Sequence, residues 1–263
     1  MGSHDFKTEY INEKVGKWCD EIKQLADIAL SQPHAAYSAY THGMQHQFRY
    51  FLRTIKGIQE QLKPLDDTIT NILIPAICGF KVSETDRRLL SLPVKAGGLG
   101  IGIVNEESDE EYRRSKSITA PLATMIPLQG DGMPNTQEES SIKSNIKKDK
   151  LTQLKEKIAA VDDSLSPETK RKVQQSKEPG ASNWLSALPI QKHGFNLNKS
   201  EFRDALALRY NQHINNLPSF CACGEKFGVT HAMNCKKGGF VNARHDNIRD
   251  FSSPHCYPRS VMM

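Results

Sequence analysis

The sequence has few of the large apolar side chains that one compact core of its length would need. Hydrophobic residues make up 38% of its 263 residues and aromatic residues only 7%, which favours small packed units joined by solvated chain. No run of about 18 apolar residues occurs, so we expect no membrane-spanning helix. The opening residues MGSHDFKTEY lack the apolar segment of a secretory signal peptide. We therefore expect an intracellular protein, nuclear or cytoplasmic, that is not secreted.

The chain also lacks a strong excess of either charge. It has 35 basic and 30 acidic residues, a net charge of +5, which is too small to identify an acidic partner, so the position of the basic residues matters more. Cysteines are few, with six in the chain. Without a secretory signal, clustered thiols indicate a metal site rather than disulfides. Cys19, Cys78 and Cys256 lie apart and are expected to be small apolar residues.

Apolar residues at intervals of three and four predict three amphipathic helices in the N-terminal part of the chain. The apolar stripes run over residues 11–29, 37–55 and 58–76. Pro33 suits the start of the second helix, and Pro64 is expected either to kink the third helix or to start it. Pro75 and Gly79 are expected to end that helix. Short connections between such helices predict a bundle.

The segment after these helices is rich in glycine and then in charge. Gly97, Gly98, Gly100 and Gly102 alternate with apolar residues and predict a tightly packed turn. A phosphate-binding loop is excluded because the Lys-Ser/Thr ending and the following helix are missing. Residues 105–180 offer few large apolar residues, so we predict a charged and largely flexible linker. Its middle can form a solvated helix, and Ser166-Pro167-Glu168 can cap another.

A cluster of soft metal ligands lies near the C-terminus, where residues 221–235 read CACGEKFGVTHAMNC. Cys221 and Cys223 can share a tight turn, which Gly224 permits. His231 and Cys235 are four residues apart and would lie on one face of a helix. Four nitrogen and sulfur ligands are typical of a closed, structural zinc site. A chance grouping of buried thiols is the alternative, and His245 or Cys256 are possible substitute ligands.

Two basic features are candidate contacts to nucleic acid. The first follows the cysteine cluster and comprises Lys236, Lys237, Arg244 and Arg249. The second is a stripe on the predicted second helix, made of His42, His46, Arg49, Arg53 and Lys56. This stripe lies roughly opposite the apolar face, and no acidic residue occurs between Gln32 and Gly57. Either feature could contact phosphates, or could simply be a solvated surface.

Acidic doublets of the kind used by polymerases occur twice, at Asp66-Asp67 and Asp162-Asp163. A two-metal polymerase site needs such a pair on a β-hairpin together with a distant carboxylate. Both doublets lie in helical patterns without a strand signal. We therefore expect neither to be catalytic, and we expect this chain not to be an enzyme.

Several segments together resemble reverse-transcriptase-like proteins of invertebrate non-LTR retrotransposons. They are TEYINEKVGKWCDEIKQLADIALSQPHAAYSAYTHGMQHQFRYFLRTI, LLSLPVKAGGLGI, SNWLSALPIQKHGF, SEFRDALALRY and CACGEKFGVTHAMNCKKGGFVNARHDNIRD. The resemblance covers most of the chain outside residues 130–180. It implies a helical thumb from an RNA-directed DNA polymerase, followed by a zinc motif with Cys221, Cys223, His231 and Cys235 as ligands.

The same resemblance implies a fragment of a transposable element. The polymerase fingers and palm are absent, the endonuclease carboxylates are expected beyond Asp250, and the tail FSSPHCYPRSVMM matches nothing expected. The opening Met is expected to be a misassigned start within a longer gene rather than a cloning scar. The implied partners are DNA or RNA, as a duplex bound without sequence preference, and the missing palm and endonuclease regions of the parent element.

We accordingly predict a mainly α protein. Its expected parts are a thumb-like bundle with a glycine-rich turn (1–104), the linker (105–180), a helix with the zinc module (181–250) and an irregular tail (251–263). The predicted function is nucleic-acid binding without catalysis. The alternative is a zinc-stabilised protein-interaction module with no nucleic-acid role.

Overall fold

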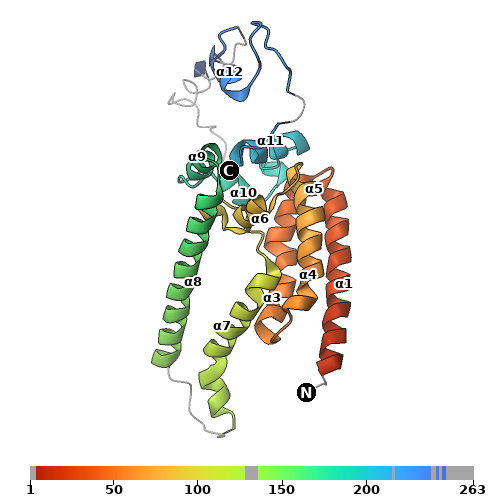
Figure 1. Ribbon diagram of the computed structural model, residues 1–263, viewed down its shortest axis with the longest axis vertical. Coiled ribbons are helices and arrows are strands. Elements are labelled where there is room, and N and C mark those ends of the chain that lie inside the picture. The colour runs from red at the N-terminus through yellow and green to blue at the C-terminus, as the bar shows by residue number, and fades with distance from the viewer. Residues whose placement is uncertain (1–3, 128–135, 215–216, 238–240, 243–244, 247–263) are drawn as a thin grey trace, which may run out of the picture. The chain divides into compact units, whose positions relative to one another are not determined.

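The computed structural model describes residues 4–127, 136–214, 217–237, 241–242 and 245–246. The described residues are mainly helical and contain no strand, only one isolated bridge between Phe220 and Lys226, which confirms the predicted fold class. The chain divides into two compact units, residues 1–212 and 213–263. We call them the N-terminal and C-terminal units (Figure 1).

Three helical segments form the first part of the N-terminal unit, as the apolar stripes predict. They are α1 (His4–Ala29), then α2 (Pro33–Ala39), η1 (Tyr40–Met44) and α3 (Gln45–Thr54), then α4 (Gln59–Thr68), η2 (Ile69–Leu73) and α5 (Ile74–Cys78). Pro33 starts the second segment and Gly79 caps the third in a left-handed conformation. Pro64 neither starts nor ends α4 but lies inside it.

The second and third segments each contain one π-helical turn, η1 and η2. A π turn holds more residues than an α turn, so it rotates everything that follows it about the helix axis. The predicted third stripe therefore fails at Ile72, which is 41% exposed, whereas Leu73, Ile74 and Ile77 are fully buried. Elsewhere the stripes form the core as predicted, with Trp18 packing edge-on against Phe48.

The glycine-rich segment is the packed turn that its sequence predicts. It follows α6 (Glu84–Ser91), which opens with a capping box between Ser83 and Asp86, and it includes η3 (Val94–Ala96). Leu99 and Ile101 are fully buried. Gly98 has no space for a side chain, because a Cβ there would lie 1.9 Å from the carbonyl oxygen of Leu92.

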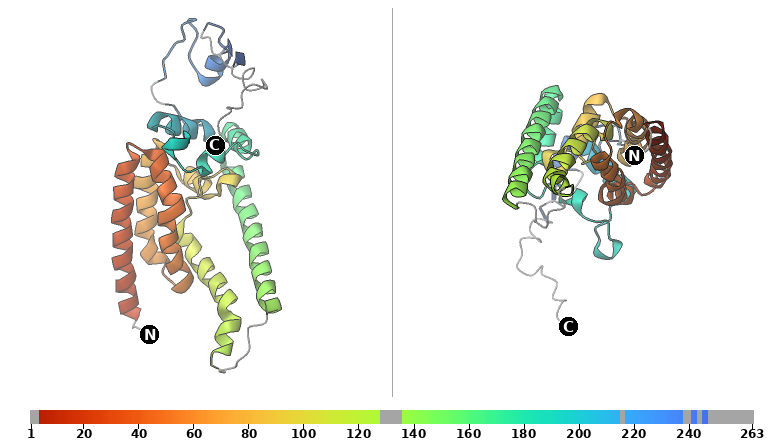
Figure 2. Two further views of the ribbon diagram at one scale, coloured as in Figure 1. Left: turned by 180° about the vertical axis from the view of Figure 1, so that it is seen from behind. Right: turned by 90° about the horizontal axis from the view of Figure 1, so that it is seen from below.

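The prediction of a largely flexible linker over residues 105–180 is wrong for the described part of that range. It forms α7 (Val104–Met125), α8 (Thr136–Ser164) and α9 (Pro167–Ser176). The expected solvated helix and the Ser166-Pro167-Glu168 cap are both present, with the Ser166 hydroxyl accepting from the Thr169 amide. Figure 2, seen from below, shows α8 beside α7 and α7 beside the bundle. The few apolar residues of α8 attach this helix to the core: Val161 is buried, and Leu154 and Ile158 pack against the core.

The helix predicted to accompany the zinc module belongs to the N-terminal unit instead. This unit also contains α10 (Asn183–Ser186), η4 (Gln191–His193) and α11 (Lys199–Arg209). A capping box between Asn198 and Glu201 opens α11. Phe202 of α11 is fully buried and stacks on His34, with ring centroids 4.8 Å apart. The predicted boundary at residue 181 therefore moves to residue 213, and the tail 251–263 lies outside the described residues.

Candidate metal centre and nucleic-acid interface

A short turn carries the first two candidate ligands of the C-terminal unit. Phe220 and Lys226 pair across it, and the Cys221 amide donates to the Glu225 carbonyl oxygen at 2.9 Å. The Gly224 amide donates back to the Cys221 carbonyl oxygen at 2.9 Å, with Gly224 at φ +90°. Because this left-handed conformation suits glycine, the chain can reverse directly after Cys223 and present both thiols on one side.

The helix α12 (Val229–Asn234) carries the other two ligands. His231 lies inside the helix and Cys235 follows its last residue. The Cys235 amide donates to the His231 carbonyl oxygen at 2.8 Å, so the four-residue spacing keeps both side chains on one face, as predicted.

The four ligand atoms converge as a tetrahedral metal site requires. The three sulfurs and the imidazole nitrogen all lie within 4.8 Å of one another. Cys221 Sγ is 3.6 Å from Cys235 Sγ, and Cys223 Sγ is 3.2 Å from His231 Nε2. Zinc bonds of about 2.3 Å to sulfur and 2.0–2.1 Å to nitrogen imply ligand separations of about 3.5–3.8 Å. The two closest separations are near these values, so the four residues could hold a metal ion.

The remainder of the C-terminal unit has little apolar core. Among its described residues only Cys235 is buried, whereas Phe220 is 68% and Met233 43% exposed. A unit this small rarely folds on apolar burial alone. His245, considered as a substitute ligand, is exposed and lies outside the cluster, and Cys256 lies outside the described residues.

The basic stretch after the cluster is described only in part. Lys236 and Lys237 are exposed directly after Cys235. Arg244 and Arg249 lie outside the described residues.

The predicted basic stripe of the second helix does not form one continuous surface. His46 is exposed, while the Nδ1 atom of His42 is 3.1 Å from the Ser38 carbonyl oxygen. Lys56 is exposed but follows the last residue of α3. His42 lies within the π turn η1 itself, whereas His46, Arg49 and Arg53 lie in α3, so the angular spacing assumed for a regular helix does not hold between them.

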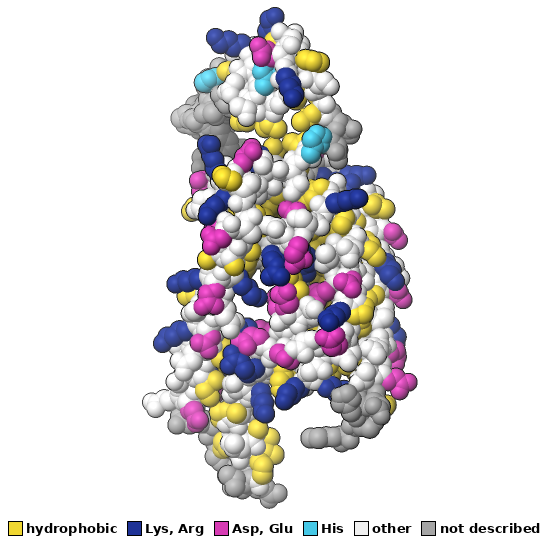
Figure 3. Space-filling model, in the orientation of Figure 1, with side chains coloured by type: hydrophobic (Ala, Val, Ile, Leu, Met, Phe, Trp, Pro, Cys, Tyr) yellow, Lys and Arg dark blue, Asp and Glu magenta, His cyan; other side chains and the backbone are white. Residues whose placement is uncertain are grey.

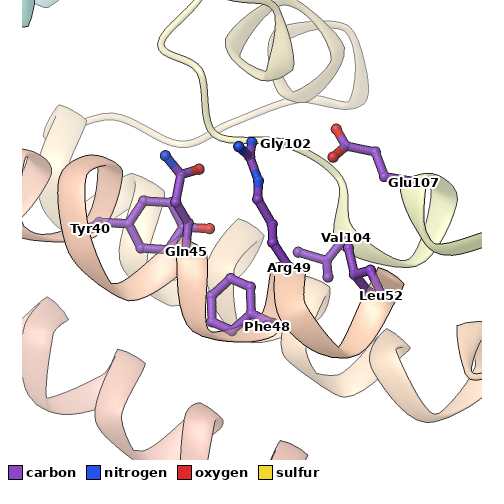
Figure 4. A pocket seen from close by; sticks show the side chains of 8 residues that line it. All are labelled: Tyr40, Gln45, Phe48, Arg49, Leu52, Gly102, Val104 and Glu107. Carbon is purple, nitrogen blue, oxygen red and sulfur yellow. The ribbon is translucent and has the colours of Figure 1, made fainter. Parts of the chain in front are cut away.

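The two arginines of the stripe face carboxylates from α7. Arg49 is half-buried and ends beside Gly102, with the Glu107 carboxylate turned toward its guanidinium (Figure 4). Arg53 Nε lies 3.4 Å from Glu111 Oε2. The second helix itself contains no acidic residue, but carboxylates of α7, far away in the sequence, lie beside its arginines. Sequence reasoning missed Glu107 and Glu111 as partners; their four-residue spacing, which matches that of the arginines, was the available signal.

The acidic doublets have structural partners. Asp66 is buried and accepts from the Val104 and Asn105 amides at 2.8 and 2.6 Å, which caps the first turn of α7. Burial raises the pKa of Asp66 to about 6, although these amides and Arg87 oppose the rise. In the second doublet, Asp162 forms an ion pair of 3.5 Å with Lys177.

Within the described part of the chain, no helix combines the length and the apolar character needed to cross a membrane. No protein-family model matches the sequence, and no curated protein or solved structure is significantly similar to it. The resemblance to reverse-transcriptase-like proteins therefore rests on the sequence segments alone.

Proposed function

We propose that this chain is a nucleic-acid-binding, non-catalytic fragment of a retrotransposon reverse-transcriptase polyprotein, with a structural zinc ion in its C-terminal unit. The observation that carries the proposal is the convergence of three thiols and one imidazole within 4.8 Å. This donor set favours zinc, and four protein ligands would leave no open position for a catalytic water. The retroelement origin is supported by the sequence segments.

Nucleic-acid binding is supported by the position of Lys236 and Lys237, which are exposed and follow directly on the ligand Cys235. A bound metal would fix the backbone there, so two cations would be held at a defined place. Contacts of this kind go to phosphates and carry no base information. The expected ligand is therefore a duplex bound without sequence preference.

The metal is tested by native mass spectrometry under reducing conditions. We expect one zinc per chain in the wild type, retention of zinc in His245→Ala, and loss of zinc in Cys235→Ala. A wild-type protein without metal would contradict the zinc proposal, and loss of metal in His245→Ala would mean that the ligand set is wrong.

Binding is tested by titrating a duplex at several salt concentrations. Lys236→Gln/Lys237→Gln should weaken binding and lower the log–log salt slope by roughly 0.9 for each lost phosphate contact. The matched control Lys81→Gln/Lys95→Gln alters two exposed lysines of the N-terminal unit and should leave the slope nearly unchanged. Equal slopes for both variants would refute the role of Lys236 and Lys237.

A protein-interaction module is the second candidate, and one observation favours it. Phe220, Met233 and Leu217 of the C-terminal unit are 68%, 43% and 41% exposed. Exposed apolar side chains mark a protein contact where they form one contiguous patch. A zinc-loaded chain that shows no salt-dependent binding to any duplex or single strand would favour this candidate.

A further inference from the structure

Two arginines of α3 lie opposite two glutamates of α7 in matching register. Arg49 and Arg53 are four residues apart, and so are Glu107 and Glu111. Four residues advance an α-helix by about 6 Å, so each arginine can meet one carboxylate across the contact between α3 and α7. Arg53 Nε is 3.4 Å from Glu111 Oε2. Figure 4 shows Arg49 ending beside Gly102, with the Glu107 carboxylate turned toward its guanidinium.

Glu110 and Glu111 of α7 also pair with cations other than those of α3. Lys150 Nζ of α8 lies 2.9 Å from Glu111 Oε1, and Arg114 Nη1 lies 3.1 Å from the same oxygen. Arg114 Nη2 is 3.0 Å from Glu110 Oε1. Glu111 is therefore in contact with three cations, which come from α3, α7 and α8.

Arg49 and the α7 carboxylates line an open cleft of about 620 Å³ between α3, α7, α8 and the glycine-rich turn. Arg53 lines an adjoining hollow of about 270 Å³, which shares Glu111, Arg114 and Lys150 with the cleft. The charged residues that line the cleft are Arg49, Arg114, Lys150 and Lys157, with Glu106, Glu107, Glu110 and Glu111. Four cations thus face four carboxylates. Acidic and basic side chains are likewise intermixed over the N-terminal unit on the face shown in Figure 3. With the carboxylates neutralised or displaced, four cations would converge on a space that a ligand can enter.

We propose that this cleft is a latent binding site for the phosphates of a nucleic-acid backbone, and that Glu107 and Glu111 occupy it in the free chain. The inference rests on the proposed nucleic-acid binding. It adds the place on the N-terminal unit where the phosphates would bind, and it explains why the glutamates would weaken that binding in the free chain. A carboxylate and a phosphate both accept paired N–H donors from arginine, so one can replace the other on Arg49 and Arg53. Glu107 and Glu111 compete with phosphates for the two arginines, and a nucleic-acid backbone that offers several phosphates displaces them.

The test compares two variants that lose the same charge. Glu107→Gln/Glu111→Gln keeps side-chain size and removes the competitor; Asp109→Asn/Glu21→Gln alters two exposed acids. Anisotropy of a fluorescein-labelled duplex is measured across a KCl series. The cleft variant should bind several-fold more tightly, and its salt slope should steepen by roughly 0.9 per added phosphate contact, about 1.8 in all. The control should keep the wild-type slope, and adding Arg49→Gln/Arg53→Gln to the cleft variant should reverse the gain.

The possible outcomes separate this inference from the proposed function. If the wild type binds and the two variants have equal slopes, the cleft is not a phosphate site, while nucleic-acid binding by the chain stands. Binding by the cleft variant alone would support the inference, and binding by none of the proteins would overturn both. Circular dichroism checks folding; if the double variant loses helix, Glu111→Gln alone should show about half of the slope change.

Discussion

Arg87 is a buried side chain whose removal should strongly destabilise the N-terminal unit, because it links three separate segments. It is 3% exposed and donates to the Ile101 and Gly102 carbonyl oxygens at 2.7 and 2.8 Å and to Thr70 Oγ1 at 2.9 Å. Its guanidinium also lies 3.8 Å from Asp66. It therefore joins η2, the glycine-rich turn and the cap of α7.

Arg87→Ala would leave these acceptors without their donor. Each buried acceptor that loses its partner costs about 1–3 kcal/mol, and breaking a buried ion pair costs about 3–5 kcal/mol. Because these terms overlap and water can enter the space, we expect a loss of about 3–5 kcal/mol in the free energy of unfolding. Such a loss is a large part of the total stability of a domain.

The adjacent Arg88 provides the control. It belongs to the same helix but is exposed and pairs only with Glu84, at 3.0 Å. Exposed pairs of this spacing contribute about 0.3–0.5 kcal/mol. Urea denaturation followed by circular dichroism should therefore show a large drop in midpoint for Arg87→Ala and almost none for Arg88→Ala. Similar midpoints for the two variants would refute the role assigned to Arg87.

Three further predictions follow from the same structure. The pKa of Asp66 rises from 3.8 to about 6 on folding, so the folded state binds more protons between those pH values. The free energy of unfolding should therefore fall by up to about 3 kcal/mol as pH rises from 4 to 7. Denaturation across this range should show a weaker pH dependence of stability for Asp66→Asn, and an unchanged pH dependence would contradict the raised pKa of Asp66. Gly98→Ala should destabilise the protein by about 1–3 kcal/mol, because its Cβ would clash with the Leu92 carbonyl. Gly16→Ala, which has open space around it in α1, should stabilise the protein by about 0.5–1 kcal/mol. The melting temperatures of the two variants should therefore shift in opposite directions from the wild type. Cys235→Ala should unfold only the C-terminal unit because structural zinc contributes folding energy directly; nuclear magnetic resonance spectra should retain the N-terminal signals, and widespread loss of them would show that the units fold together.

Local signals in the sequence predicted the features that depend on neighbouring residues. The apolar stripe on α1 predicted buried Ile11 and Ile22 because a regular helix preserves its angular period. The spacing of Cys221, Cys223, His231 and Cys235 predicted the ligand cluster because turn and helix geometry are both short-range.

Features that depend on distant segments were missed. Ile72 became exposed because η2 adds a residue that no periodic pattern reveals. The linker that contains α8 was predicted to be largely flexible because it has few large apolar residues. The attachment of α8 includes the contact of Lys150 with Glu111, 39 residues away, which no local pattern indicates. The neutralisation of Arg53 likewise depends on the packing of α3 against α7, and no feature within the second helix indicates it.

The number of residues in η1 sets the direction in which Arg49 and Arg53 face. Arg49 and Arg53 lie in α3, which begins directly after this five-residue π turn. Deleting one residue there, such as Gly43, would allow a regular α turn and rotate α3 by about 100° relative to α2. The arginines would then no longer face Glu107 and Glu111, although every charged side chain would still be present. A single-codon deletion in η1 would therefore separate the arginines from these glutamates without removing any charged side chain.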